Sequence, residues 1–208
     1  MIAPAYWKRA SQELAARDEV MHRLVRQCDG LTLGSRGDAF ATLARSMVGQ
    51  QISVKAAQAV WQRLVAGLGV MAPPAVLATD VARLRACGLS SRKASYIVDL
   101  AQHFASGALD PARWHDVDDE TLIAQLTEVK GIGRWTAEMF LIFYLARPDV
   151  LPIADVGLQR AMRLQYNQGK PLTSARMARI GKAWAPWRSV ATWYLWRSLD
   201  AAPVTPGA

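Results

Sequence analysis

The sequence predicts an all-α protein of about ten helices, and three observations carry this prediction. Apolar residues recur at the helical spacing of three and four along nearly the whole chain. No stretch alternates apolar and polar residues over the length of a strand. Glycines, prolines and capping residues divide the apolar pattern into separate segments. The 208 residues, 51% of them hydrophobic, suffice for a buried core in one large domain or in two small lobes.

The first half of the chain divides into helices at recognisable capping residues. One helix is predicted over residues 11–28, with Leu24 on its apolar side and Gly30 closing it. Asp38 and Ser53 are predicted N-caps of the next two helices, because short polar side chains accept hydrogen bonds from the N–H groups of a first turn. Three further helical segments are predicted: one beginning at Pro73, one capped by Asp80, and one from Ser90 or Ser91 to Gly107.

The second half begins with a loop at Pro111. Asp118 is the predicted cap of a helix that leads into a tight turn at residues 131–133. A strongly apolar helix follows over residues 134–145, and Pro148 prevents its continuation because proline lacks a backbone N–H. Three more helices and a frayed tail complete the prediction: residues 155–166, 174–184, 187–199 and 201–208.

The charge of the chain indicates a polyanionic partner. The net charge is +8 and the sequence pI is about 9.9, which favours nucleic acid, although a basic protein need not bind any. Cys28 and Cys87 lie far apart, without the spacing of a zinc site or a disulfide framework. No signal-peptide core and no apolar run of about 18 residues occur, so we expect a cytoplasmic protein, nucleoid-associated in a bacterium, without a membrane partner.

The turn Gly131-Ile132-Gly133 is the most informative segment. Glycine permits the positive φ angles of a tight turn and leaves room for another backbone. The N–H groups at the start of the following helix then point outward with the positive end of the helix dipole, which makes an anion site. The flanking side chains that we expect to assist are Lys130, Arg134 and Thr136. The alternative is an ordinary corner between two helices.

A longer string makes the turn more specific. Residues 129–139, VKGIGRWTAEM, resemble the helix-hairpin-helix of the HhH-GPD DNA glycosylase superfamily, most closely the DNA-3-methyladenine glycosylase II group. The resemblance implies that the hairpin, at about residues 118–146, grips the DNA backbone beside a damaged nucleotide. It also implies a monovalent cation, Na⁺ or K⁺, held by the backbone carbonyls of Thr127, Val129 and Ile132, and no required cofactor.

Asp155 follows the hairpin by about twenty residues, at the end of an apolar, proline-containing approach to a helix. By itself such a residue is a helix cap. The resemblance implies that it is the catalytic carboxylate, although Ala154 stands where the family often has glycine. A fixed carboxylate stabilises the positive charge that develops on the sugar when an N-glycosidic bond breaks. Asp149 is predicted to be a surface turn residue.

The position of the strand-nicking lysine separates two groups of the superfamily. Members that nick DNA carry a lysine nucleophile just before the Thr-Ala pair of the hairpin, and that position is Trp135 here. Lys130 lies one helical turn too early. The resemblance therefore implies a monofunctional enzyme, without lyase activity. The four-cysteine iron–sulfur cluster of some relatives has no counterpart in the sequence.

Further blocks extend the resemblance over most of the chain. Residues 46–53 resemble the corner that enters the minor groove, with Gln51 as the helix plug and Ser53 as a DNA contact. The flipped base is expected to lie against Trp135, Met139 and Trp196. Residues 84–94 resemble a structural connector, in which Arg92 and Lys93 are expected to contact phosphate.

Together these residues predict one HhH-GPD domain over residues 1–208, built as two helical lobes with a DNA groove between them. The implied activity is base excision repair by a monomer that removes alkylated purines, 3-methyladenine and 7-methylguanine, from double-stranded DNA. Two alternatives stay open. One is a superfamily enzyme for another lesion, and the other is a non-catalytic helix-hairpin-helix protein that binds DNA, in which Asp155 only caps a helix.

Overall fold

The structure, a computed structural model, describes residues 3–28, 30–33 and 37–200, and these residues form helices and loops without a strand. The all-α prediction is confirmed. The chain folds into two compact units. We call the residues before 36 and after 140 unit 1, and residues 36–140 unit 2. Within the described ranges, no helix is both long and apolar enough to cross a membrane. The tail at 201–208, predicted to be frayed, lies outside the described residues.

Unit 2 is a continuous segment whose helices begin where the sequence predicts. Its elements are α3 (Ala39–Gly49), α4 (Val54–Leu68), α5 (Pro73–Leu77), α6 (Val81–Ala86), α7 (Ser91–Ala105), the 3-10 helix η1 (Pro111–Asp116), α8 (Asp119–Thr127) and most of α9 (Arg134–Phe143). The predicted caps Asp38, Ser53, Asp80, Ser90 and Asp118 each accept a hydrogen bond from the backbone N–H three residues on. The predicted loop at Pro111 is wrong, because residues 111–116 form η1.

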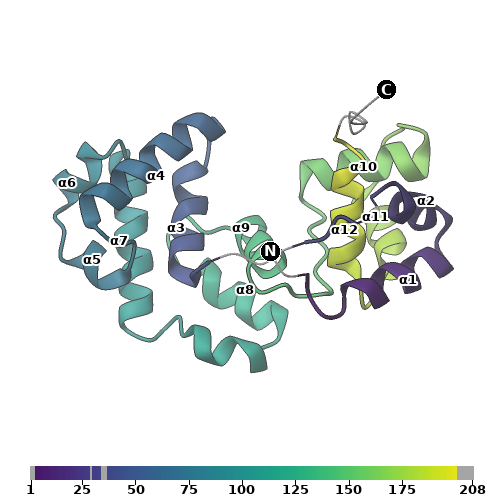
Figure 1. Ribbon diagram of the computed structural model, residues 1–208, viewed down its shortest axis with the longest axis horizontal. Helices are drawn as coiled ribbons and strands as arrows, with labels where there is room; N and C mark the ends of the chain where they lie inside the picture. Colours follow the sequence, from purple (N-terminus) through teal and green to yellow (C-terminus); the bar gives the residue numbers. More distant parts are fainter. Residues whose placement is uncertain (1–2, 29, 34–36, 201–208) are drawn as a thin grey trace. The chain divides into compact units, whose positions relative to one another are not determined.

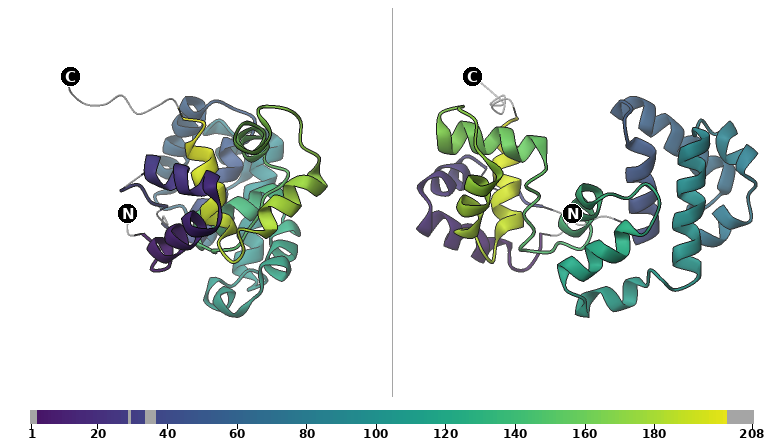
Figure 2. Two further views of the ribbon diagram at one scale, coloured as in Figure 1. Left: turned by 90° about the vertical axis from the view of Figure 1, so that its right-hand side faces the viewer. Right: turned by 180° about the vertical axis from the view of Figure 1, so that it is seen from behind.

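The long helix α7 organises the core of unit 2. It packs against α3, α5 and α6, and Figure 2 shows it running alongside α3. A row of edge-to-face aromatic rings, Phe40, Phe104, Trp114 and Phe140, then connects α3 and α7 to η1 and α9. These ring contacts fix the helix α9 that begins at the predicted hairpin.

Unit 1 joins the two ends of the described chain. Its helices are α1 (Trp7–Arg17), α2 (Glu19–Gln27), α10 (Val156–Asn167), α11 (Ser174–Lys182) and α12 (Arg188–Arg197), and the last turn of α9 belongs with it. Helix α12 packs against α1, α2 and α10, as Figure 1 shows. Its residues 189–195 are all buried, so α12 is the centre of this unit.

The single helix predicted over residues 11–28 is wrong, because Asp18 divides it. Asp18 has extended backbone angles that end α1, and its Oδ1 accepts the N–H of Met21 to cap α2. Its other oxygen accepts hydrogen bonds from the Tyr166 hydroxyl at 2.9 Å and the Trp184 indole at 3.2 Å. Both donors come from the far end of the sequence, which local spacing does not report. The predicted helix over 134–145 is also shorter, ending at Phe143.

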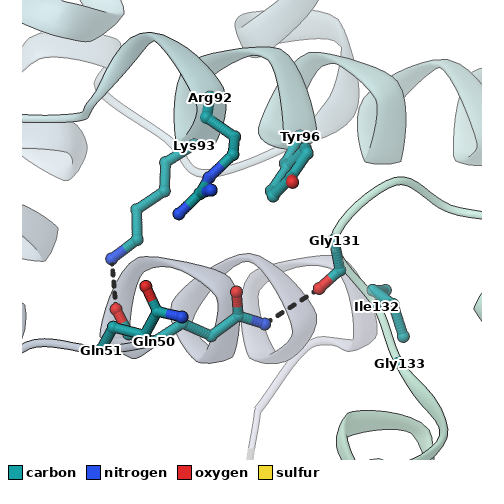
Figure 3. Close-up of a pocket in the computed structure, with 8 residues that line it drawn as sticks. All are labelled: Gln50, Gln51, Arg92, Lys93, Tyr96, Gly131, Ile132 and Gly133. Carbon is teal, nitrogen blue, oxygen red and sulfur yellow. Dashed lines mark hydrogen bonds between the residues drawn. The ribbon is translucent and has the colours of Figure 1, made fainter.

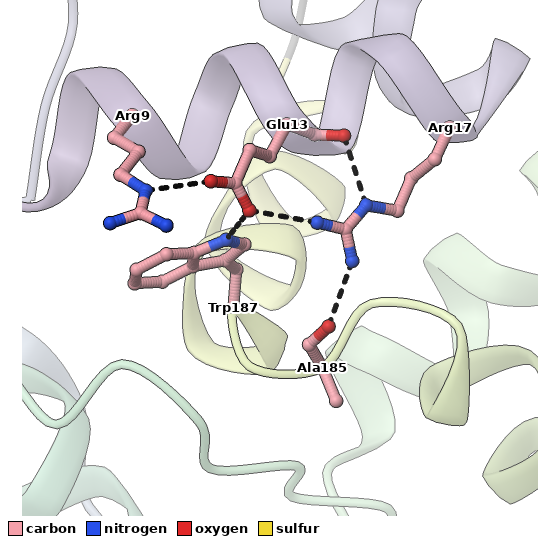
Figure 4. Close-up of polar contacts among 5 residues, drawn as sticks. All are labelled: Arg9, Glu13, Arg17, Ala185 and Trp187. Atoms are coloured by element: carbon pink, nitrogen blue, oxygen red, sulfur yellow. Dashed lines mark hydrogen bonds and ion pairs between the residues drawn. The ribbon is translucent and has the colours of Figure 1, made fainter.

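A second polar cluster attaches α1 to the turn before α12 (Figure 4). Glu13 accepts hydrogen bonds from the Trp187 indole at 2.8 Å, from Arg9 at 2.7 Å and from Arg17 at 2.8 Å. The indole hydrogen bond and the two guanidinium groups lower the pKa of Glu13. Arg17 also donates to the Ala185 carbonyl at 2.9 Å. Helix α1 therefore belongs structurally with the C-terminal helices.

Candidate active site

The hairpin turn requires glycine at its first position for two reasons. Gly131 has φ +88°, in the left-handed region. A Cβ at this position would overlap the ring of Tyr96, far inside contact distance. Gly133, in contrast, is exposed and nothing lies within 4 Å of its hypothetical Cβ. The turn thus packs on α7 through Gly131 and opens to solvent at Gly133.

Helix α9 begins directly after the turn and presents backbone donors. The first backbone hydrogen bond of α9 runs from the Ala137 N–H to the Gly133 carbonyl at 3.0 Å. The N–H groups of residues 134–136 therefore precede any acceptor that the helix itself supplies. Thr136 is only 5% exposed, and its expected phosphate contact stays a prediction. This helix start is suited to bind an anion.

Lys130, the residue before the glycine turn, is held to α7 by a buried carboxylate, that of Asp99. The backbone N–H of Lys130 donates to Asp99 Oδ2 at 2.9 Å, and its ammonium lies 3.2 Å from Asp99 Oδ1. Burial by itself would raise the pKa of Asp99, but the hydrogen bonds and charge of Lys130, with His103 nearby, outweigh burial and lower it. The Lys130 side chain remains largely exposed. Asp99 thus fixes the hairpin while the cation above it still faces solvent.

Arg134 is more constrained than the sequence suggests. Its guanidinium makes a two-pronged ion pair with Glu120, at 2.6 and 2.8 Å, and its Nε donates to Glu138 at 3.0 Å. The hydrogen bonds from Arg134 to Glu120 are the largest contribution that raises the pKa of Arg134. Its expected phosphate contact stays a prediction, because a phosphate must share this guanidinium with two carboxylates.

The predicted cation ligands are backbone carbonyls near the turn. The carbonyl of Val129 accepts the N–H of Ile132 at 3.1 Å, and the second lone pair of such an oxygen can take a further partner. Backbone carbonyl oxygens are donors of the kind that hard cations prefer, and the assignment of Thr127, Val129 and Ile132 as cation ligands stays a prediction. In the described part of the chain, no group of three or more His, Cys, Asp or Glu is placed to hold a metal.

The predicted helix plug lies in the same unit as the hairpin, and the residue before it is hydrogen-bonded to the hairpin. Gln50 donates from its side-chain amide to the Gly131 carbonyl at 2.9 Å. Gln51 is exposed and has φ 59°, a left-handed conformation that is uncommon outside glycine. Ser53 caps α4 with its hydroxyl, which accepts the Ala56 N–H at 3.2 Å. The plug corner, residues 50–53, is therefore a defined turn rather than a loose loop.

A polar cavity of about 410 Å³ separates the plug corner from the hairpin (Figure 3). Its walls come from α7 as well as from the two turns: Gln50, Gln51, Arg92, Lys93, Tyr96, Gly131, Ile132 and Gly133. Of the predicted base contacts in unit 2, Trp135 is 46% exposed and Met139 is partly buried. The remaining one, Trp196, belongs to unit 1 together with Asp155.

Asp155 lies at the start of α10, and one oxygen of its carboxylate accepts two hydrogen bonds. Its Oδ1 accepts the Leu158 N–H at 2.6 Å and the Trp196 indole N–H at 2.8 Å. Gly157 allows this approach, because a Cβ there would lie 3.0 Å from Asp155 Oδ1 and 3.2 Å from Trp196 Cδ1. The cap that sequence reasoning offered as the alternative is real, and the tryptophan predicted for the base pocket orients the same carboxylate.

Trp196 is itself held by a ring that sequence reasoning missed. Phe143, the last residue of α9, is 40% exposed and stacks on Trp196 with centroids 5.5 Å apart and planes 14° from parallel. Its only signal in the sequence is an aromatic residue at the exposed end of an apolar helix. The pair gives Asp155 an aromatic neighbourhood that contains both a hydrogen-bond donor and a stacked surface.

The chain that delivers Asp155 is anchored to α11 and α12. Asp149, predicted to be a surface turn residue, does lie in a turn, but it also pairs with Arg188 through contacts of 2.7 and 2.9 Å. The buried Ser189 accepts the Val150 N–H at 2.9 Å. Gly181 makes room for Leu151, which would lie 2.5 Å from a Cβ at that position. The approach to Asp155 is thus rigidly packed.

The fold and these residues define a class: an all-helical protein with a helix-hairpin-helix and an oriented aspartate at a later helix start. The model of the HhH-GPD superfamily base excision DNA repair proteins matches residues 44–186, more than half of the chain. The chain belongs to this family, which confirms the resemblance predicted from the sequence.

Similar proteins match nearly the whole chain. DNA-3-methyladenine glycosylase 1 of Schizosaccharomyces pombe is 32% identical, over 95% of this chain and 90% of the relative. The crystal structure of a DNA-3-methyladenine glycosidase from Bacillus halodurans has a TM-score of 0.87 at 35% identity, covering 95% of this chain and 92% of that one. Schizosaccharomyces pombe 3-methyladenine DNA glycosylase in complex with abasic DNA has a TM-score of 0.80 at 32% identity, covering 93% and 98%.

Proposed function

We propose that this protein is a monofunctional DNA glycosylase that hydrolyses the N-glycosidic bond of alkylated purines, 3-methyladenine and 7-methylguanine, in double-stranded DNA. The observation that carries the proposal is the carboxylate of Asp155, which the Leu158 N–H and the Trp196 indole hold in one orientation. Membership of the base excision repair family and the names of the similar proteins support the substrate class.

Asp155 acts on charge that develops at the sugar. As the bond to the base breaks, the deoxyribose becomes oxocarbenium-like, and a fixed carboxylate beside it stabilises that charge. The same carboxylate orients the attacking water. An alkylated purine already carries positive charge and leaves without a strong general acid, so one carboxylate is sufficient. An electron-rich ring such as that of Trp196, which donates to Asp155, favours a cationic base by roughly 0.5–2 kcal/mol per contact.

DNA binding is assigned to the hairpin and the plug corner. The N–H groups at the start of α9 and the exposed Lys130 suit backbone phosphates, and the net charge of +8 supports a polyanionic partner. Gln51 replaces the flipped nucleotide in the stack, since its side chain is exposed at the corner. The carbonyls of Thr127, Val129 and Ile132 would hold a monovalent cation, which would supply positive charge at the phosphate.

The absence of lyase activity follows from the residue before the Thr136-Ala137 pair. That residue is Trp135, whose indole cannot form a Schiff base with the sugar. Lys130 is directed to Asp99, outside that position. The expected product is therefore an intact strand with an abasic site. We also expect the protein to act as a monomer.

The test is release of free 3-methyladenine and 7-methylguanine from methylated duplex DNA, with Asp155→Asn beside the wild type. Asparagine keeps an oxygen for the Leu158 N–H and the Trp196 indole but removes the negative charge. Release by the wild type, its loss in Asp155→Asn, and no strand nicking before alkali treatment support the proposal. Release of a different lesion base would redirect the substrate assignment. DNA binding without release of any base would leave Asp155 as a cap alone.

A further inference from the structure

The C-terminal end of α3 is capped by a side chain from another helix. The ammonium of Lys93, on α7, donates to the carbonyls of Val48 and Gln50, both at 2.7 Å. The last carbonyls of a helix lack partners within it and carry the negative end of the helix dipole. A cation at this position therefore satisfies two acceptors and the dipole together. Figure 3 shows the Lys93 side chain extended toward the backbone of the plug corner.

The same short segment is held from its other side by the hairpin. The Gln50 side chain donates to the Gly131 carbonyl at 2.9 Å, while its own carbonyl accepts from Lys93. Gln51 follows at once with φ 59°. A residue other than glycine persists in this conformation only where its surroundings determine it. Here Lys93 and Gly131 fix the peptide that precedes Gln51.

Lys93 and its neighbour Arg92 differ in their exposure to solvent. The Arg92 side chain is exposed beside the 410 Å³ cavity, whereas Lys93 is partly buried. Burial, and next the charge of Arg92, lower the pKa of Lys93. The ammonium of Lys93 is directed to two protein carbonyls, and its expected phosphate contact stays a prediction.

We propose that Lys93 is a positioning residue for the helix plug. It holds the carbonyls of Val48 and Gln50 so that Gln51 is presented in its left-handed conformation before DNA is bound. The energetic cost of ordering the corner is then met during folding rather than during base flipping. This inference rests on the proposed function, because it assigns Lys93 to the plug of a base-flipping enzyme.

The experiment measures plug insertion and base release separately. Plug insertion is followed by the fluorescence of 2-aminopurine placed opposite a tetrahydrofuran abasic analogue in duplex DNA. Base release is followed as single-turnover release of 7-methylguanine. The variants are Lys93→Met, Lys93→Arg, Gln51→Ala and the double variant Lys93→Met/Gln51→Ala. Arg85→Met, which removes an exposed cation from α6 of the same unit, is the matched control for lost charge.

We expect Lys93→Met to reduce release by about tenfold or more and to reduce the fluorescence change in parallel, because two charge-assisted hydrogen bonds are lost. Lys93→Arg should recover part of both signals, and Arg85→Met should match the wild type. The double variant should be no slower than Gln51→Ala, since two residues that act through one plug are not additive. If Lys93→Met acted only by damaging the folded structure, its fold reduction in release would multiply with that of Gln51→Ala in the double variant.

Three outcomes would overturn the inference in an active enzyme: wild-type behaviour of Lys93→Met, multiplicative effects in the double variant, or no effect of Gln51→Ala. A wild type that neither releases a methylated base nor changes the fluorescence would instead remove the proposed function. Circular dichroism and thermal unfolding check that each variant folds. If Lys93→Met does not fold, Lys93→Gln, which keeps one donor group, is tested in its place against the same expectations.

Discussion

The indole N–H of Trp196 donates to Asp155 Oδ1 at 2.8 Å, to the same oxygen that caps α10 through the Leu158 N–H at 2.6 Å. The two donors reach the carboxylate from different helices, α12 and α10. A carboxylate held at one oxygen by both has little freedom to rotate. Orientation of Asp155 is therefore a property of the folded protein before any DNA is present.

Trp196→Phe tests this orientation. Phenylalanine keeps a ring that can stack on Phe143 but removes the N–H donor. We expect single-turnover base release to fall about tenfold to a hundredfold, which corresponds to the loss of one hydrogen bond to a charged group. DNA affinity, measured by fluorescence anisotropy, should change little. A variant with wild-type release would show that the indole N–H does not contribute to the reaction.

Gly157→Ala is expected to separate stability from activity. Alanine favours a helix over glycine by up to about 1 kcal/mol, and the part of this gain available at the second residue of α10 should offset strain and keep the melting temperature near that of the wild type. Its Cβ would press on Asp155 Oδ1 at 3.0 Å and on Trp196 Cδ1 at 3.2 Å, which displaces the pair. Base release should therefore drop while thermal unfolding changes little. Loss of both together would contradict this account.

Asp99→Asn should loosen the hairpin and change the response to acid. The pKa of Asp99 is lowered in the folded protein, so its stabilisation is fully present above an ordinary aspartate pKa of about 4 and is lost as pH falls through the lowered value. In urea unfolding at pH 7 we expect Asp99→Asn to cost about 1–3 kcal/mol. The difference from the wild type should shrink as the pH is lowered to about 3. An undiminished difference in acid would exclude the ion pair with Lys130 as its source.

Asp18→Ala should be far more destabilising than an ordinary cap substitution. It removes the cap of α2 and also leaves the Tyr166 hydroxyl and the Trp184 indole without their acceptor. We expect a loss of about 2–4 kcal/mol in the free energy of unfolding. The matched control is Asp38→Ala, an exposed cap of α3, which should cost about 1 kcal/mol. Equal losses in the two variants would contradict a structural role for Asp18 beyond capping.

The helix starts are predictable because capping is a local interaction. Asp38, Asp80 and Asp118 each bond to an N–H three residues away, and the sequence contains both partners of that contact. Asp18 makes the same kind of local contact, because its Oδ1 accepts the Met21 N–H and caps α2. The sequence prediction missed this cap because helical periodicity continues across residue 18. The hydrogen bonds from Tyr166 and Trp184, almost the whole chain away, also favour the interruption and leave no local pattern.

The same distinction between local and distant contacts applies to the candidate site. Gly131 and Asp155 are identifiable, since a glycine turn and a cap before a helix leave a pattern in the sequence, and the family resemblance gives them a role. The partners toward which the charged side chains point cannot be identified from the sequence. Arg134 turns to Glu120 and Lys93 turns to the end of α3, and both contacts depend on how separate helices pack. Phe143 escapes notice for the same reason, because its partner Trp196 belongs to another helix.

The division of the chain into one continuous and one discontinuous unit affects how the protein is made. Residues 37–140 can acquire their native packing as soon as they leave the ribosome, because every helix that they pack against within unit 2 is already synthesised. Helices α1 and α2 are synthesised before unit 2 but must wait for the later helices, since Asp18 and Glu13 also pair with Tyr166, Trp184 and Trp187. The segment of α1 and α2 therefore stays without its partners until α12 has been synthesised, and Asp155 gains its second hydrogen bond only when Trp196 is present.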